Sequence, residues 1–180
     1  MRRLMLLRHA KTETDAPSGR DQDRRLDERG LRDAAEMGGW ISRHPPFPDC
    51  VLVSPAVRTV QTWDIAWAAM KGMVPEPRVE QVEELYGADP AQLLTAIRMA
   101  SVSDPKRLLL IGHNPGMHEL ALALVGSGDA AARKALTDNL PTSGLAVLDF
   151  ATEDWDDVAF RRGKLVLFVS PKLLKQASGD

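Results

Sequence analysis

Three short apolar runs, each followed by polar residues and then by a helix-start signal, most strongly constrain how this chain can fold. The runs are residues 4–7, 50–53 and 108–111. Uninterrupted apolar runs of this length are typical of strands that are buried on both faces of a sheet. Because helical patterns separate the runs, the sequence predicts an α/β fold. We expect a three-layer sandwich in which helices cover both faces of a mostly parallel central sheet.

Capping residues and prolines mark where the helices begin and end. An apolar stripe of helical period predicts a helix over residues 28–43, ending before Pro45. Ser54-Pro55, Asp89-Pro90 and Asn114-Pro115 each place an N-cap residue before a proline at the first helical position. The other expected elements are helices over 55–70, from 90 through Ile97, from 115 to about 125 and over 129–138, strands over 78–82, 107–112, 145–150 and 165–169, a long loop over 10–26, and a frayed end from Lys172.

Length and composition predict one domain over residues 1–180, with residues 171–180 as a flexible tail. The chain has 23 basic and 25 acidic residues, so it has no global field that would attract nucleic acid or an anionic membrane. The N-terminal apolar run is too short for a signal peptide or a membrane span, and we expect a cytoplasmic protein. Cys50 is the sole cysteine, which excludes an internal disulfide and a Cys-rich zinc site.

Polar side chains gather where the predicted strands end. Arg8 and His9 follow the first strand, Arg58 lies in the first turn of the helix after the second strand, and His113 follows the third. Carboxyl ends of parallel strands meet at one edge of a sheet, where α/β proteins bind ligands. Two arginines beside a helix N-terminus suit a phosphoryl dianion. The pattern therefore predicts a phosphate site.

A neutral imidazole can attack phosphorus without a metal or a cofactor. We therefore predict that His9 is a nucleophile that forms a covalent phosphohistidine. His113 and both arginines would stabilise the equatorial oxygens during transfer. His118 follows His113 by five positions rather than four, which disfavours a zinc motif on one helix face.

Two parts of the predicted site stay open. Glu84, with Glu83 beside it, is placed on an inter-element loop where a carboxyl group could exchange protons with a leaving group. The alternative is that the two glutamates are an ordinary exposed pair with no role in the reaction. Ten of the fourteen residues from 20 to 33 are charged with both signs, which is typical of a solvated surface. The alternative is that one or more side chains of this run reach the anion, namely Arg20, Arg24 and Arg25.

Three segments together resemble the histidine phosphatase superfamily, formerly the phosphoglycerate-mutase-like family. They are Leu6-Leu7-Arg8-His9-Ala10, Val53-Ser54-Pro55-x-x-Arg58-x-x-Gln61-Thr62 and Ile111-Gly112-His113-Asn114-Pro115. Alanine after His9, the stretch Asp23-Arg24-Arg25-Leu26-x-x-Arg29-Gly30 and a short region in the 80s are similar to the SixA-type phosphohistidine phosphatases. That branch usually has proline at the position of Arg25.

The resemblance implies a phosphoglycerate-mutase-like fold and a role for each site residue. His9 would accept the phosphoryl group, His113 and the two arginines Arg8 and Arg58 would form the phosphate pocket, and Glu84 would be the acid. The Trp-Glu-Gly-like segment of the mutases is absent, which disfavours mutase activity.

The predicted substrate is phosphohistidine on a partner protein. Little chain lies between Pro75 and Pro90 to form a lid, which favours an open pocket. A small-molecule or aryl phosphomonoesterase is the alternative within the same superfamily. A non-catalytic module that binds phospho-groups is the alternative of another class. A metallohydrolase is a third possibility, which predicts that chelators inhibit the activity.

Overall fold

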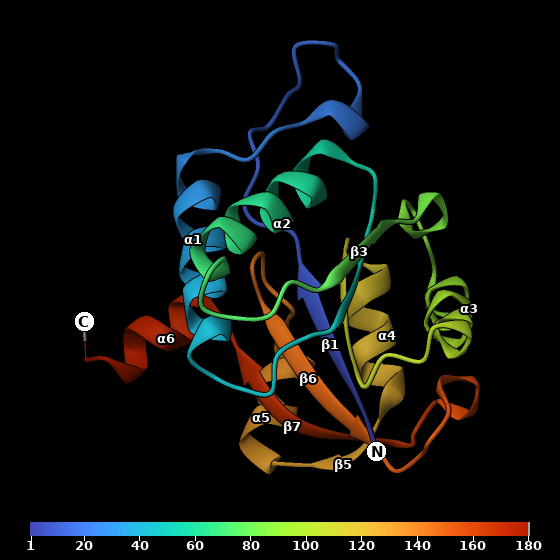
Figure 1. Cartoon of the computed structure of the whole chain (residues 1–180). Helices are drawn as coiled ribbons and strands as arrows, with labels where there is room; N and C mark the ends of the chain where they lie inside the picture. Colours follow the sequence, from blue (N-terminus) through green and yellow to red (C-terminus); the bar gives the residue numbers. More distant parts are fainter. Residues whose placement is uncertain (180) are drawn as a thin grey trace.

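A seven-stranded sheet forms the middle layer of the computed structural model, which describes residues 1–179 (Figure 1). The strands are β1 Arg2–Arg8, β2 Cys50–Val53, β3 Arg78–Gln81, β4 Arg107–Gly112, β5 Val125–Gly128, β6 Leu145–Phe150 and β7 Gly163–Val169. The helices are α1 Glu28–Ser42, α2 Val57–Met70, α3 Pro90–Met99, α4 Gly116–Leu124, α5 Ala130–Asp138 and α6 Pro171–Ala177. Short 3₁₀ turns are η1 Asp21–Asp23, η2 Glu83–Leu85, η3 Ala100–Val102 and η4 Trp155–Asp157.

The strand order places the ends of three strands side by side. The order is β3-β2-β4-β1-β6-β7-β5, and the first four strands are parallel to one another. β6 is antiparallel to both of its neighbours, β1 and β7, while β5 pairs in parallel with β7. The predicted mostly parallel sheet is confirmed. Because β2, β4 and β1 are adjacent and parallel, the residues after them meet at one edge.

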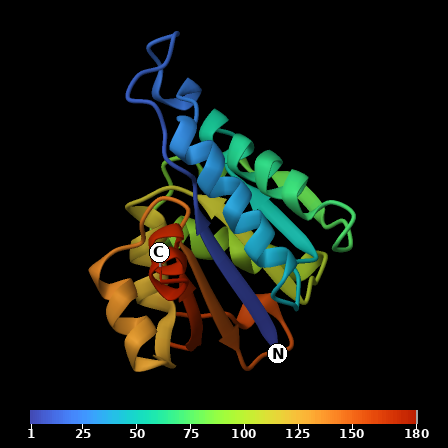
Figure 2. The same cartoon turned by 90° about the vertical axis from the view of Figure 1, so that its left-hand side faces the viewer.

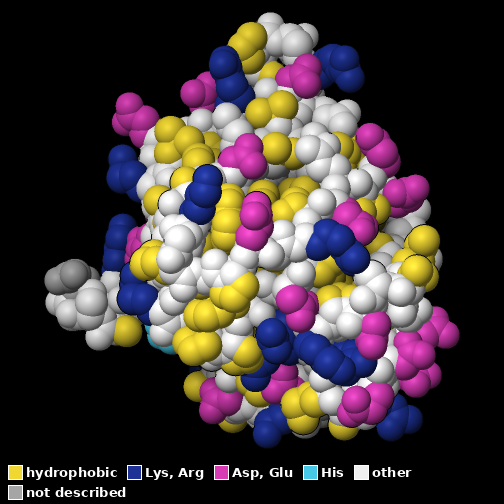
Figure 3. Space-filling view, viewed as in Figure 1, with side chains coloured by type: hydrophobic (Ala, Val, Ile, Leu, Met, Phe, Trp, Pro, Cys, Tyr) yellow, Lys and Arg dark blue, Asp and Glu magenta, His cyan; other side chains and the backbone are white. Residues whose placement is uncertain are grey.

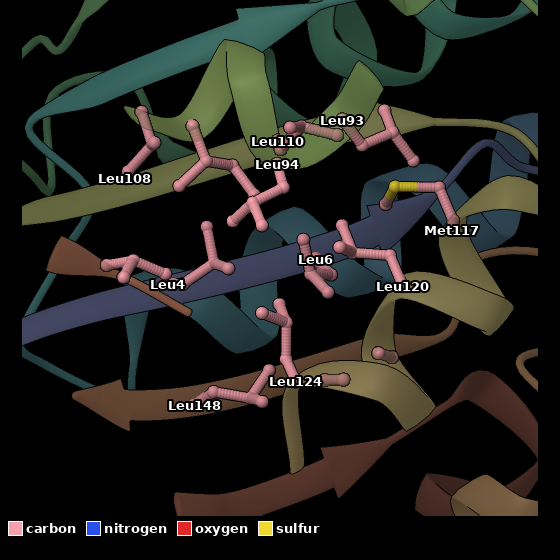
Figure 4. Close-up of a cluster of buried hydrophobic side chains, with 14 of the residues drawn as sticks. Leu4, Leu6, Leu93, Leu94, Leu108, Leu110, Met117, Leu120, Leu124 and Leu148 are labelled. Carbon is pink, nitrogen blue, oxygen red and sulfur yellow. The ribbon is translucent and has the colours of Figure 1, made fainter. Parts of the chain in front are cut away.

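Side chains of β1 alternate between two apolar cores, one on each face of the sheet. Leu4 and Leu6 pack with residues of α3, α4 and α5, while Met5 and Leu7 pack with residues of α1 and α2. Figure 4 shows Leu4 and Leu6 along β1, among leucines of α3 and α4. Since both faces are covered, the side chains of residues 4–7 are all buried, as an uninterrupted apolar run predicts. The two layers of helices are visible from the side in Figure 2.

Several element boundaries differ from the predicted ones. α2 begins at Val57 with Ala56 as its N-cap, and α4 begins at Gly116 with Pro115 as its N-cap, so the prolines do not take the first helical position. The predicted start at Asp89-Pro90 is confirmed, with a capping box to Gln92.

The C-terminal part also departs from the prediction. A helix, α6, is present where a frayed end was expected, and Ser170 caps it by accepting a hydrogen bond from Leu173 N. β5 was not predicted. Residue 180 of the expected tail lies outside the described residues.

Charged side chains of both signs are mixed over the face of the molecule seen in Figure 3. This mixture agrees with the net charge of −2. Among residues 1–179, no helix is long and apolar enough to cross a membrane.

Candidate active site

The end of β1 is fixed by hydrogen bonds from three neighbouring segments. Arg8 N donates to Gly144 O at 3.1 Å and His9 N donates to Gly112 O at 3.1 Å. Ser143 N lies 3.1 Å from the carbonyl oxygens of both Arg8 and His9. Ala10 N donates to Thr62 Oγ1 of α2 at 3.0 Å. The backbone that carries Arg8 and His9 is therefore held in one position.

The structure brings together the four residues that the strand-end argument selected. The rings of His9 and His113 lie 5.4 Å apart between centroids and are tilted by 54°. Arg58 and Arg8 are close enough for their charges to lower the pKa of His9. His9 and Arg58 are buried at 6% and 5% exposure, so interactions between these groups are weakly screened.

His9 has one free nitrogen and a neutral ring. Its Nδ1 lies 2.8 Å from Ala10 O, and because a carbonyl only accepts, Nδ1 carries the proton. The Nε2 lone pair remains available. Burial lowers the pKa of His9 to about 3, against the opposing effect of the Ala10 hydrogen bond. The imidazole is therefore neutral near pH 7, as a nucleophile requires.

His113 is oriented by Ser54 at the end of β2. Ser54 Oγ lies 2.7 Å from His113 Nε2, and the ring of Tyr86 meets His113 edge-on at 5.5 Å between centroids. Burial, followed by the charge of Arg58, lowers the pKa of His113 to about 4. The predicted role of Ser54 as an N-cap is wrong, because its hydroxyl contacts a histidine 59 residues away and α2 starts later.

Both arginines are held at one end of the guanidinium. Arg8 Nη1 donates to Leu140 O at 3.2 Å. Arg58 Nη1 donates to Asp21 O at 2.8 Å, and Arg58 Nη2 donates to Asp21 Oδ2 at 3.0 Å. Within residues 1–179, these contacts leave the Nε atoms of both arginines without a hydrogen-bond partner.

Four buried side-chain atoms lack a hydrogen-bond partner within residues 1–179, and they all belong to this region. They are Arg8 Nε, Arg58 Nε, His113 Nδ1 and Ser143 Oγ. Buried polar groups are nearly always paired, so such a cluster is a feature of a ligand site. Two guanidinium Nε–H donors suit the oxygens of an anion such as phosphate.

Glu84 is not brought into this set. Its side chain is exposed and lines a separate cavity of about 400 Å³ with Cys50, Leu52 and Gln92. None of Arg8, His9, Arg58 or His113 lines that cavity. Glu83 is also exposed, on the same η2 turn. The geometry gives no support to either carboxyl group as the acid.

Sequence reasoning missed Asp21 and Tyr86. Asp21 lies in the charged run that was interpreted as a solvated surface, and only its contact with Arg58, 37 positions away, distinguishes it. Tyr86 is the only tyrosine of the chain and follows the predicted Glu83-Glu84 pair, but no local pattern indicates its contact with His113. Of the three candidate arginines, Arg24 reaches Asp21, donating from Nε to Oδ1 at 3.0 Å.

Metal ligands do not cluster in the described part of the chain. Residues 1–179 contain no group of three or more His, Cys, Asp or Glu side chains placed to hold a metal ion. His118 contacts Leu136 O through Nε2 at 2.6 Å.

Comparison with known proteins agrees with this geometry. Residues 4–96 match the histidine phosphatase superfamily (branch 1). An uncharacterised protein of Mycobacterium leprae is 36% identical over 174 residues, covering 92% of this chain and 100% of that protein.

Two solved structures of proteins assigned as phosphohistidine phosphatase SixA are similar over 94% of this chain. The one from Agrobacterium tumefaciens is 33% identical with a TM-score of 0.77, and 98% of it is covered. The one from Nakamurella multipartitia is 29% identical with a TM-score of 0.79, and 96% of it is covered. The chain therefore belongs to the histidine phosphatase superfamily and is a phosphatase of that superfamily.

Proposed function

We propose that this phosphatase removes the phosphoryl group of phosphohistidine on a partner protein, through a covalent intermediate on His9. The observation that carries the proposal is the state of His9. Its proton lies on Nδ1 and its Nε2 lone pair is free, beside His113, the half-buried Arg8 and the buried Arg58. A free Nε2 on a neutral ring is what attack on phosphorus requires.

The reaction has two steps. The substrate imidazole first takes a proton from solvent on its free ring nitrogen. His9 Nε2 then forms a bond to phosphorus while the P–N bond to that imidazole breaks, and the imidazole leaves in its neutral form. Arg8, Arg58 and His113 bind the equatorial oxygens as charge develops. Water then attacks phosphorus, the bond to His9 breaks, and inorganic phosphate and a proton are released.

The absence of a suitable proton donor favours a phosphoramidate over an alkyl ester. In the described structure the carboxylate in contact with the pocket is Asp21, and hydrogen bonds from Tyr86 and Arg58 hold its pKa well below its usual range. Asp21 is therefore ionised and cannot give a proton to a leaving alkoxide. A protonated imidazole leaves phosphorus without such help, and phosphohistidine fits the site for this reason.

The relatives support the same substrate class. The protein from Agrobacterium tumefaciens that is 33% identical to this chain is assigned as a phosphohistidine phosphatase. An aryl phosphate, whose leaving group is also good, is the alternative small substrate. A module that binds phospho-groups without turnover is the alternative of another class.

Trapping of the intermediate tests the proposal. The protein is mixed with a phosphohistidine peptide labelled on phosphorus and quenched in alkali, in which phosphohistidine survives. We expect acid-labile label on the wild-type protein after the peptide is removed, and no label on the His9→Ala protein. His44→Gln, a change in a histidine that stacks on Trp40 outside the pocket, is the matched control and retains the label. No label on the wild-type protein, or label that survives His9→Ala, would falsify the proposal.

A second measurement separates the substrates. Turnover of the phosphohistidine peptide is compared with that of an aryl phosphate and an alkyl phosphate at equal concentration. We expect the peptide and the aryl phosphate to be hydrolysed far faster than the alkyl phosphate. Equal rates for all three would contradict the leaving-group argument.

A further inference from the structure

Asp21 binds three side chains from three different parts of the chain. Its Oδ2 accepts from Arg58 Nη2 of α2 at 3.0 Å and from Tyr86 Oη after η2 at 2.6 Å. Its Oδ1 accepts from Arg24 Nε at 3.0 Å. Its carbonyl oxygen accepts from Arg58 Nη1 at 2.8 Å. One residue on the loop before α1 thus joins the loop, α2 and the segment after η2.

The contacts with Asp21 use one edge of the Arg58 guanidinium and leave the other free. A guanidinium presents two edges to an oxyanion, one formed by Nη1 and Nη2 and one formed by Nε and one Nη. Asp21 takes the Nη1–Nη2 edge, while Nε is buried and unpartnered. Arg8 is held in a similar way, because Leu140 O binds its Nη1 and its Nε is also buried and unpartnered.

The same carboxylate also supports His113. Tyr86, whose hydroxyl donates to Asp21, places its ring edge-on to His113 at 90° and 5.5 Å between centroids. The guanidinium carbon of Arg58 lies 5.9 Å from the centroid of that tyrosine ring, within the range of a cation–π contact. Asp21 therefore contacts Arg58 directly and His113 through one intermediate ring.

Arg24 keeps the carboxylate in place. Its Nε binds Asp21 Oδ1, and its Nη1 donates to Thr12 Oγ1 at 2.8 Å and to Glu13 O at 3.3 Å. The side chain of Asp21 is about half exposed, at 53%, and Arg24 binds the carboxylate oxygen that Arg58 and Tyr86 do not use. Arg24 thus links Asp21 to Thr12 and Glu13 in the loop that follows β1.

We propose that Asp21 is a positioning residue of the phosphate pocket, which turns the Nε edge of Arg58 toward the phosphoryl group and steadies His113 through Tyr86. The inference rests on the proposed function in one respect, that the pocket binds a phosphoryl group. Asp21 is then not an anion that competes with phosphate, because it occupies the guanidinium edge that the phosphate does not use.

Binding of orthovanadate, a phosphate analogue, tests the proposal without requiring turnover. We expect Asp21→Ala to raise the dissociation constant of orthovanadate about tenfold. A loss of affinity of this size is typical of one charge-assisted hydrogen bond. Tyr86→Phe removes one of the contacts and should weaken binding less. Asp21→Asn keeps an oxygen that can accept from Arg58 and Tyr86, and we expect it to recover part of the loss.

Asp23→Ala is the matched control. Asp23 lies in the same η1 turn and its loss changes the net charge equally, but its carboxylate accepts from Ser18 Oγ at 2.7 Å. The thermal unfolding midpoint of each variant shows whether it is folded at the assay temperature. We expect Asp23→Ala to bind orthovanadate like the wild-type protein.

The outcomes separate this inference from the proposed function. If orthovanadate binds Asp21→Ala as tightly as the wild-type protein, or more tightly, Asp21 does not position Arg58. A loss of equal size in Asp23→Ala, or no orthovanadate binding by the wild-type protein, also overturns the inference. If Asp21→Ala weakens orthovanadate binding but no phosphohistidine forms on the wild-type protein, the proposed function fails while the role of Asp21 stands.

Discussion

The two histidines of the pocket differ from histidine in solution because His9 is buried and His113 is half-buried. Burial lowers the pKa of His9 to about 3 and that of His113 to about 4, against an ordinary value of about 6.5. We expect both rings to stay neutral from pH 8 down to about pH 5. NMR titration of the ring protons of the free protein, assigned with His9→Ala and His113→Gln, checks this expectation. A midpoint near pH 6.5 for either ring would show that the pocket is more hydrated than the structure implies.

Single residues also show where sequence reasoning succeeds and where it stops. Arg8, His9, Arg58 and His113 could be found because strand ends in a parallel sheet converge, a rule that needs only the order of elements. The contact of Ser54 with His113 could not be found in this way, because a serine before a proline indicates a helix cap when only the neighbouring residues are considered.

The pair of helices that carries Arg58 depends on a glycine. A Cβ on Gly38 of α1 would lie 2.3 Å from Ala66 O of α2, and backbone atoms at such a crossing cannot move aside cheaply. We expect Gly38→Ala to lower the free energy of unfolding by about 1–3 kcal/mol, as overpacking does. Urea denaturation monitored by circular dichroism measures this change.

The neighbouring glycine is a control of opposite sign. A Cβ on Gly39 would meet Arg43 Nη1 at 3.2 Å as its nearest atom, and that atom is the end of a flexible side chain. We expect Gly39→Ala to raise the free energy of unfolding by up to about 1 kcal/mol through helix propensity. If both variants lost stability equally, the close approach of α1 and α2 would not be the cause.

Elements with strong local signals were predicted well, but β5, which depends on pairing alone, was not. α1 and α3 agree with the apolar stripe and with the Asp89 cap. β5 has the sequence Val-Gly-Ser-Gly, in which the two glycines disfavour a strand, and it pairs with β7. α6 begins at Pro171 after the N-cap Ser170, the same start signal used for other helices, so this helix could have been predicted.

At the scale of the whole molecule, the fold class followed from the sequence but the strand order did not. Alternating strands and helices indicate a covered, mostly parallel sheet, as observed. β6 runs antiparallel to both β1 and β7, and no local pattern encodes that direction. The expected acid Glu84 illustrates the same limit, because a loop position does not say which way a side chain points.

The unpartnered donors of the two arginines have a thermodynamic consequence for the whole chain. Burial lowers the pKa of Arg8, which indicates that its positive charge is poorly compensated. An oxyanion that binds the folded protein, and not the unfolded chain, shifts the folding equilibrium by mass action. At a concentration one hundred times its dissociation constant, inorganic phosphate should add about 2.7 kcal/mol to the free energy of unfolding.

Thermal unfolding in phosphate and in chloride at equal ionic strength measures this coupling. We expect a higher midpoint in phosphate, and a smaller rise for Arg58→Ala, which lacks one pair of donors. Identical midpoints for the wild-type protein in both salts would show that the buried donors do not bind the anion. With such coupling, the product of the reaction would also be a folding ligand of the enzyme, and the population of unfolded chains would fall as phosphate accumulates.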